Sequence, residues 1–219
     1  GGCLLTDKTV IVHGTALTSA EFTKMAAANM KLVWSPKSNL FLYNDTTRID
    51  LAIAAGVQTI ALAPDWSLGG GINLLDELRT ARQVSQAKWP GLVASKRIVE
   101  MVTSDAAKVL GVFDKLGSLE VGKRADIAVV SADPTNPYDA IIAARPADME
   151  LVLLDGRALY GHSSLKSVGP AAPGCEDISI CGVGKFLCVA ETSTLNKLDQ
   201  TYGTILQTLT TELSNYDNS

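Results

Sequence analysis

Short apolar runs and amphipathic segments alternate through the first 90 residues of this 219-residue chain, and this repeat constrains the fold more than any other feature. Segments with strand and helix patterns follow one another at residues 9–13, 20–29, 31–36, 46–55, 57–63 and 72–87. Each strand and the helix after it take roughly 25 to 30 residues, which suits a βαβ crossover unit. The repeat therefore predicts an α/β fold with a parallel sheet.

Each predicted strand ends close to a side chain that can take part in chemistry. His13 ends the first apolar run, Ser35 follows the second and Asp65 follows the third. In parallel α/β sheets, ligands and substrates bind at the carboxyl ends of the strands. These three residues therefore mark the edge of the sheet where we expect function.

Asp65 lies in the segment TIALAPDWSLGGGIN, between an apolar run and three consecutive glycines. A helix cap would sit directly before the next helix, where Asn73 is already a suitable cap. A phosphate-binding loop would need a GxGxxG pattern or a lysine followed by Ser or Thr, and neither is present. A metal-binding or proton-transferring carboxylate fits this position, although carboxylates at strand ends also have structural roles.

The other polar residues near the strand ends have ordinary structural interpretations as well. His13 is followed by Gly14, which would let a ligand approach closely, but a single histidine is often a structural residue. The segment SPKSN (35–39) reads as a turn in which Ser38 and Asn39 bond to the local backbone. We assign no role to His162.

The second half of the chain has a different texture. Helical patterns continue through residues 92–110, and short apolar runs then alternate with turns over 116–133 and 149–161, with a hairpin at Asp155-Gly156. Residues 162–174 are rich in Ser, Gly and Pro and predict a linker or surface arm. A leucine-faced helix is expected at roughly 192–213.

Composition and charge exclude several classes of protein. The formal net charge is −4 and the basic residues are scattered, so we expect no nucleic-acid partner. No apolar run approaches the length of a membrane span, and the N-terminal residues lack a signal-peptide pattern. Cys175, Cys181 and Cys188 could form a disulfide, remain as thiols or bind metal; their clustering favours a disulfide and an extracytoplasmic location for a soluble protein.

Three segments, in this order, resemble the amidohydrolase superfamily, in the branch that contains cytosine and guanine deaminases and chlorotriazine hydrolases. They are VIVHGTALT, WSPKSNLFL and ALAPDWSLGGGINLLDELR. Residues 101–134 resemble a helix of that family and the return of the chain to its small β domain, and LVLLDGRALYG resembles the final hairpin of that domain. The resemblance covers residues 9–161 and implies part of a (β/α)8 barrel, from strand six to strand eight.

The resemblance also implies roles for individual residues. Asp65 matches the aspartate after strand eight, a metal ligand that takes a proton from the attacking water. His13 matches the histidine after strand six, which polarises the substrate or bonds to the leaving group. Trp66 stands where a small residue is common and would line the pocket, and Ser38 and Asn39 would contact substrate.

The family's other metal ligands are not in this chain. An HxH pair after strand one and a histidine after strand five are required, and the chain has two histidines in all, His13 and His162. Catalytic zinc normally has three protein ligands. We therefore expect the C-terminal portion of a longer hydrolase, with zinc bound in the complete enzyme and none bound by this chain alone.

The expected organisation is a barrel portion at 1–112, a small β-sandwich at 113–161, and a linker, Cys-containing segment and C-terminal helix at 162–219. The complete enzyme would hydrolyse a C–N bond in a small amide or nitrogen heterocycle, including by deamination, and the isolated chain would be inactive. The alternative function is a non-catalytic binding or assembly module. Because half a barrel leaves open sheet edges, we expect the chain to bind the missing half, a partner chain or another copy of itself.

Overall fold

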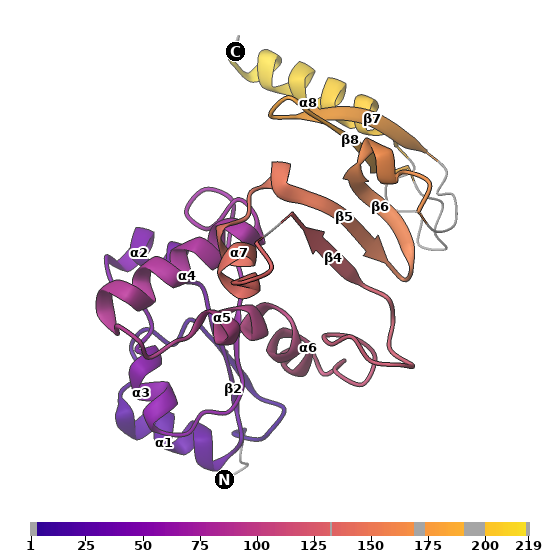
Figure 1. The fold of residues 1–219 in the computed structure, drawn as a ribbon. Helices are drawn as coiled ribbons and strands as arrows, with labels where there is room; N and C mark the ends of the chain where they lie inside the picture. The colour runs from indigo at the N-terminus through magenta and orange to yellow at the C-terminus, as the bar shows by residue number, and fades with distance from the viewer. Residues whose placement is uncertain (1–3, 132, 169–173, 191–199, 218–219) are drawn as a thin grey trace. The chain divides into compact units, whose positions relative to one another are not determined.

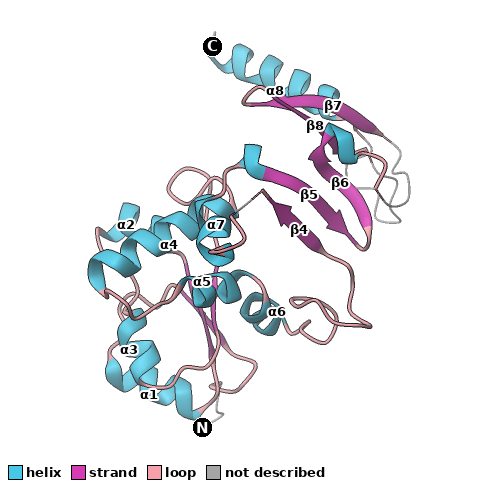
Figure 2. Ribbon diagram, viewed as in Figure 1, coloured by secondary structure: helices cyan, strands magenta, loops and turns pink. Residues whose placement is uncertain are grey.

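The computed structural model describes residues 4–131, 133–168, 174–190 and 200–217 (Figure 1). The chain divides into two compact units. The first comprises residues 1–123 and 132–145, and the second comprises residues 124–131 and 146–219. Helices and strands alternate in the first unit, whereas strands dominate the second (Figure 2). The α/β fold expected from the sequence is therefore present in the first unit.

The sheet of the first unit has three parallel strands in the order β1-β2-β3. They are β1 (Val10–Val12), β2 (Lys31–Trp34) and β3 (Ile60–Leu62). In this register Val12 pairs with Val33, and Trp34 pairs with Leu62. The strands therefore end at one edge of an open sheet, and the described residues do not close it into a barrel.

Seven helices in the described part of the first unit connect or cover these strands. They are α1 (Ser19–Ala27), α2 (Pro36–Tyr43), α3 (Ile49–Ala54), α4 (Leu74–Lys88), α5 (Ser95–Val102), α6 (Ser104–Leu110) and α7 (Pro137–Ala143). A capping box is present at the start of α1, where Thr18 and Glu21 bond to each other's backbone amides. The helical pattern at 92–110 is divided at Thr103, and α7 was not predicted.

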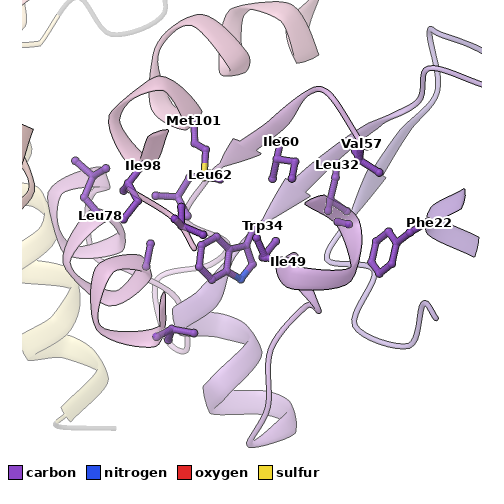
Figure 3. Packing of buried hydrophobic residues seen from close by; sticks show 14 of the residues in the cluster. Phe22, Leu32, Trp34, Ile49, Val57, Ile60, Leu62, Leu78, Ile98 and Met101 are labelled. Carbon is purple, nitrogen blue, oxygen red and sulfur yellow. The ribbon is translucent and has the colours of Figure 1, made fainter. Parts of the chain in front are cut away.

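The core of the first unit surrounds the central strand β2 (Figure 3). Trp34 is fully buried and its ring centroid lies 6.2 Å from that of Trp89. Helices α1, α3, α4 and α5 contribute buried side chains, which include Phe22, Ile49, Leu78, Ile98 and Met101. Each such side chain stabilises the fold by roughly 1.5–3 kcal/mol through burial, so β2 and its ends are firmly placed.

The second unit contains one antiparallel sheet in the order β4-β5-β6-β8-β7. The strands are β4 (Ile127–Val130), β5 (Met149–Leu154), β6 (Arg157–His162), β7 (Cys175–Ile180) and β8 (Val183–Cys188). The 3-10 helices Pro146–Asp148 and Ser163–Leu165 and helix α8 (Tyr202–Asp217) complete this unit. The predicted hairpin at Asp155-Gly156 is confirmed, and both residues have positive φ, as a type I′ turn requires.

Strands β7 and β8 lie in the segment that the sequence predicted as linker and Cys-containing tail. They extend the sheet beyond the predicted module, and the described residues form one sheet there rather than two facing sheets. The sequence did not predict these two strands because the outward-facing positions of an edge hairpin are polar, and a polar composition also suits a linker. The C-terminal helix begins at Tyr202, and residues 192–199 of its predicted span lie outside the described residues.

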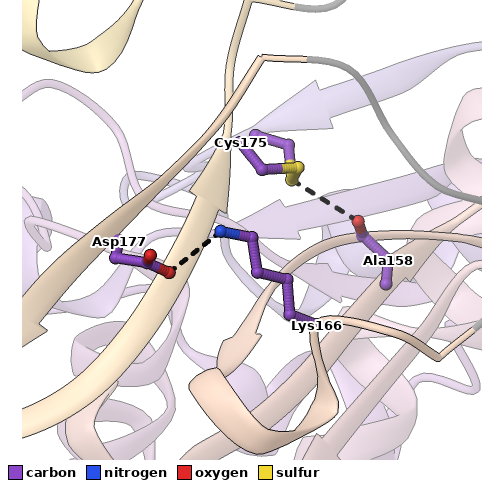
Figure 4. The surroundings of a disulfide bond; sticks show 5 residues. Ala158, Lys166, Cys175 and Asp177 are labelled. Carbon is purple, nitrogen blue, oxygen red and sulfur yellow. Dashed lines mark hydrogen bonds and ion pairs between the residues drawn. A yellow bond between two sulfur atoms is a disulfide. The ribbon is translucent and has the colours of Figure 1, made fainter.

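A disulfide joins Cys175 and Cys188, which lie opposite each other on β7 and β8 (Figure 4). Of the three open alternatives, the structure therefore contains the disulfide, and Cys181 is a free, exposed thiol. Lys166 forms an ion pair with Asp177 of β7 at 3.0 Å beside it. In the described part of the chain, no helix has both the length and the apolarity to cross a bilayer.

Candidate active site

His13 is the first residue after β1 and adopts a left-handed backbone conformation, with φ of 64°. Its amide donates to the Val33 carbonyl at 2.9 Å, so the pairing with β2 continues beyond Val12. Its carbonyl accepts a hydrogen bond from the Thr47 hydroxyl at 2.6 Å. This bond holds a conformation that residues other than glycine seldom adopt.

Helix α2 begins at Pro36, so the interpretation of SPKSN as a turn was wrong. Proline ends β2 but is also favoured in the first turn of a helix, because its φ is already helical and its missing N–H is not needed there. The helix places Ser38 and Asn39 in its first turn, and both are fully buried. Their side chains therefore face the sheet edge instead of bonding to a local turn.

Asp65 follows β3 by three residues and completes the group. The Ser38 hydroxyl donates to Asp65 Oδ2 at 2.6 Å, and His13 Nε2 lies 3.8 Å from the same oxygen. The His13 and Asp65 side chains remain 27% and 32% exposed. Residues from three strand ends thus meet around one carboxylate oxygen that solvent or a ligand can reach.

A buried polar network supports His13 from behind. The Asn39 amide nitrogen lies 3.1 Å from His13 Nδ1. Asn39 Oδ1 lies 3.1 Å from the Thr47 hydroxyl and 3.5 Å from the Thr46 hydroxyl. Thr46 in turn accepts a hydrogen bond from Trp34 Nε1 at 2.8 Å. The side chains around the imidazole are therefore held by partners on β2, on α2 and in the segment before α3.

The glycines after Asp65 allow close backbone approach. A Cβ atom on Gly70 would lie 2.7 Å from the Trp66 carbonyl oxygen, and one on Gly71 would lie 2.4 Å from Glu77 Oε2. Asn73 caps α4 by accepting from the Asp76 amide at 2.9 Å. The cap interpretation of Asp65 is thus excluded, because Asn73 already fills that role.

Glu77 of α4 is a fully buried carboxyl that links this helix to the start of α2. Its Oε1 accepts a hydrogen bond from the Lys37 backbone amide at 3.1 Å. Ser35 makes no side-chain cap, so Glu77 supplies a cap for the first turn of α2 from another helix. Among the described residues its Oε2 has no hydrogen-bond partner, and burial raises the pKa of this carboxyl above its usual value.

Trp66 lies directly after Asp65 and is 44% exposed. A Cβ atom on Gly69 would come within 3.0 Å of both the Trp66 ring nitrogen and the Phe41 ring. The Trp66 and Phe41 side chains therefore both approach Gly69, beside Asp65. The role of Trp66 in lining a pocket, like the substrate contacts assigned to Ser38 and Asn39, stays a prediction.

His13 and Asp65 do not by themselves make a metal centre. Among the described residues there is no group of three or more His, Cys, Asp or Glu side chains placed to hold a metal ion. Zinc sites in enzymes normally have three protein ligands and an open position. One imidazole and one carboxylate fall short of that set, so any complete centre needs ligands from outside the described residues.

Sequence reasoning missed Thr46, Thr47 and Glu77. The two threonines were assigned to a helix over 46–55, but α3 begins only at Ile49, because both hydroxyls bond to site residues instead. Threonine is disfavoured in helix interiors because its hydroxyl bonds to nearby polar groups. The two adjacent threonines could therefore have indicated a later helix start. Glu77 looked like an ordinary first-turn acidic residue, and nothing in the sequence indicated that it was buried.

Known proteins are similar to this chain over the first unit and part of the second. The model of the "Amidohydrolase family" matches residues 1–159. A 5-methylthioadenosine/S-adenosylhomocysteine deaminase of Desulforudis audaxviator is 30% identical over 158 residues, which are 67% of this chain and 36% of that protein. An s-triazine hydrolase of Gordonia rubripertincta is 28% identical over 128 residues, which are 58% of this chain and 27% of that protein.

A solved structure shares the fold. The adenosine deaminase of Xanthomonas campestris, crystallised with bound zinc, superposes with a TM-score of 0.64 at 27% identity, over 71% of this chain and 37% of that protein. The chain thus spans 27–37% of the lengths of these three proteins. The residues matched by the family model include His13, Asn39 and Asp65.

Proposed function

The chain belongs to the amidohydrolase family, and we propose on this premise that it forms part of an enzyme that hydrolyses a carbon–nitrogen bond in a small amide or nitrogen heterocycle. Its parallel strands would be the sixth to eighth of a (β/α)8 barrel. The observation that carries the proposal is the meeting of His13, Ser38 and Asp65 around one carboxylate oxygen at the carboxyl ends of parallel strands. The deaminase and hydrolase relatives support this reaction class.

Asp65 and His13 would share the chemistry. The Asp65 carboxylate would take the proton of the attacking water, and the short bond from Ser38 would hold its Oδ2 in place. His13 Nε2 would donate a hydrogen bond to the substrate or the leaving group. Trp66 would form an apolar wall beside the carboxylate.

A divalent metal, most simply zinc, would be bound in the complete enzyme with Asp65 as one ligand. The adenosine deaminase structure with zinc supports this choice. The described residues supply too few donors, so we assign no step of the reaction to the metal here. The remaining ligands would come from the part of the barrel that is outside this chain, supplied by the same polypeptide or by a partner.

The intact gene product provides the test of function. We expect it to release ammonia or amine from a panel of aminopurines, aminotriazines and small amides, and to contain about one metal ion per chain. Asp65→Asn should lower kcat/KM by about 100-fold or more, the scale of a lost proton acceptor. Asp114→Asn, at an exposed position of the same unit, is the matched control. Full activity in Asp65→Asn would overturn the proposal.

The two-donor site favours one second candidate, a non-catalytic binding or assembly module on the same scaffold. Metal analysis separates the two: an intact product that binds no metal and turns over no substrate on the panel would favour the module.

For either function we propose that the open edge of the parallel sheet is covered by the rest of the barrel or by a second copy of the chain. Val12, on edge strand β1, is 55% exposed. Light scattering of the isolated chain should show self-association, and a stable monomer would contradict the proposal that a second copy covers this edge.

A further inference from the structure

The polar network behind His13 has a direction, because one of its members can only donate. The indole N–H of Trp34 has no acceptor function, so the Thr46 hydroxyl must accept from it at 2.8 Å. The single Thr46 proton is then free to point to Asn39 Oδ1, at 3.5 Å the longest link of the network. All three side chains are almost fully buried, so water does not compete for these bonds.

This direction orients the Asn39 amide. Its oxygen faces the Thr46 hydroxyl, whose proton is free, whereas the one Thr47 hydroxyl proton is donated to the His13 carbonyl. The Asn39 NH₂ group therefore faces His13 Nδ1 at 3.1 Å. An amide NH₂ can only donate, so Nδ1 must accept and the ring proton must lie on Nε2. Asp65 favours the same tautomer, because an Nε2–H attracts Oδ2 at 3.8 Å whereas an Nε2 lone pair would repel it.

We propose that Trp34, Thr46 and Asn39 are positioning residues that hold His13 in its Nε2–H tautomer. Asn39 then acts through His13 and not by touching substrate, which explains why its amide is fully buried behind the ring. The tautomer follows from these contacts alone. Only its use, as a hydrogen-bond donor to substrate, rests on the proposed function.

Ring ¹⁵N chemical shifts of the histidines measure the tautomer directly. The chain has two histidines, so the spectrum contains two ring systems. His162 is an internal reference, because its Nδ1 accepts from the Ser164 backbone amide at 3.3 Å and its proton must lie on Nε2. We expect His13 to give the same pattern as His162 in the unmodified chain at neutral pH. A protonated Nδ1 with a bare Nε2 on His13 would overturn the proposal.

Substitutions in the network test its direction. A carboxylate can only accept, so Asn39→Asp should move a proton to His13 Nδ1 and leave His162 unchanged. Thr46→Val removes the relay and should reduce the Nε2–H population of His13, whereas Thr46→Ser keeps the hydroxyl and should restore it. An unchanged His13 pattern in a folded Thr46→Val chain would overturn the role of Thr46, and the Thr46 pair decides the matter if Asn39→Asp does not fold.

Activity of the intact gene product separates this proposal from the proposed function. If both hold, Thr46→Val should lower kcat more than it raises KM, and Thr46→Ser should restore kcat. If the tautomer results hold but the intact product is inactive on every substrate class, the proposed function fails and the positioning network stands. If the product is active and His13 carries its proton on Nδ1, the network proposal fails alone.

Discussion

In the three-stranded sheet all strands end at the same edge, whereas neighbouring strands of the five-stranded sheet end at opposite edges. The parallel arrangement brings His13, Ser38 and Asp65 together, although consecutive members of this group are 25 and 27 residues apart in sequence. The antiparallel sheet brings together residues that flank a hairpin, such as Cys175 and Cys188. The same chain therefore uses one sheet to assemble a site and the other to fasten neighbouring strands.

The two units also differ in how they are stabilised. The first has a large cluster of buried apolar side chains around β2, and the second has a small cluster that contains Leu151 and Phe186. The second unit also carries the disulfide. We infer that the first unit is held mainly by burial and the second depends more on its covalent link. The following changes test this contrast, from the largest expected effect to the smallest.

Removing one fully buried phenylalanine from each unit compares the two cores. Phe22→Ala should cost about 3–5 kcal/mol of unfolding free energy, because the cavity is enclosed by the core around β2. Phe186→Ala should cost less, because the small cluster around it can collapse. All three tryptophans, Trp34, Trp66 and Trp89, lie in the first unit, so their fluorescence in urea reports on Phe22. Hydrogen exchange of β8 amides reports on Phe186, and an equal or larger loss there would break the contrast.

Replacing both bridged cysteines with serine should cost the second unit about 3 kcal/mol, as expected for a disulfide that closes a loop of this size. Faster hydrogen exchange should appear in β7 and β8. Cys181→Ser is the matched control, because that thiol is free and exposed, and it should change exchange little. Unchanged protection of β7 after loss of the disulfide would show that burial is sufficient in this unit too.

Adding a methyl group to Gly70 tests the tight loop beside Asp65. Gly70→Ala places a Cβ 2.7 Å from a backbone oxygen, and we expect a loss of about 1–3 kcal/mol from overpacking, measured by urea unfolding. Gly184→Ala in the second unit is the control, since its Cβ would meet a side-chain hydroxyl at 3.1 Å, which can rotate away. Equal tolerance at both positions would mean that the loop can shift without cost.

The pH dependence of stability tests Glu77. Burial raises its folded-state pKa above the unfolded value, so the folded state binds the proton more tightly. Its contribution to stability is complete below the unfolded pKa and is lost as pH rises through the folded pKa. Glu77→Gln removes this loss, so the Tm of the variant relative to the unmodified chain should rise from pH 4 to pH 7.

Glu21→Gln is the control with opposite sign. The hydrogen bond from Thr18 holds the pKa of Glu21 below its usual value, so its contribution is present above the unfolded pKa and is lost as pH falls through the folded pKa. The relative Tm of Glu21→Gln should therefore fall from pH 4 to pH 7. Parallel trends in the two variants would contradict the assignment of a raised pKa to Glu77.

The sequence predicted the alternating elements of the first unit because periodicity and caps are local signals. The Thr18–Glu21 box and the Asp155-Gly156 turn are both visible within a few letters. It predicted the edge where His13 and Asp65 meet, because parallel strands share one functional edge. The assigned roles of these residues are still to be tested.

What the sequence could not reveal depends on contacts between distant segments. Glu77 is buried because α4 packs next to the start of α2, and no local pattern encodes that contact. Thr47 leaves the helical pattern because its hydroxyl bonds to the His13 carbonyl, 34 residues earlier. Strands β7 and β8 were hidden by a polar composition that suits an edge hairpin as well as it suits a linker.

The hydrogen bond from Trp34 to Thr46 also has a consequence for how the parallel sheet reaches its correct alignment. Side chains alternate between the faces of a strand, so a slip of β2 by one residue would carry the indole to the opposite face. The indole N–H would then lose its hydrogen bond to Thr46, and leaving a buried donor without an acceptor costs roughly 1–3 kcal/mol. One buried indole thus penalises misaligned pairings of β2 during folding.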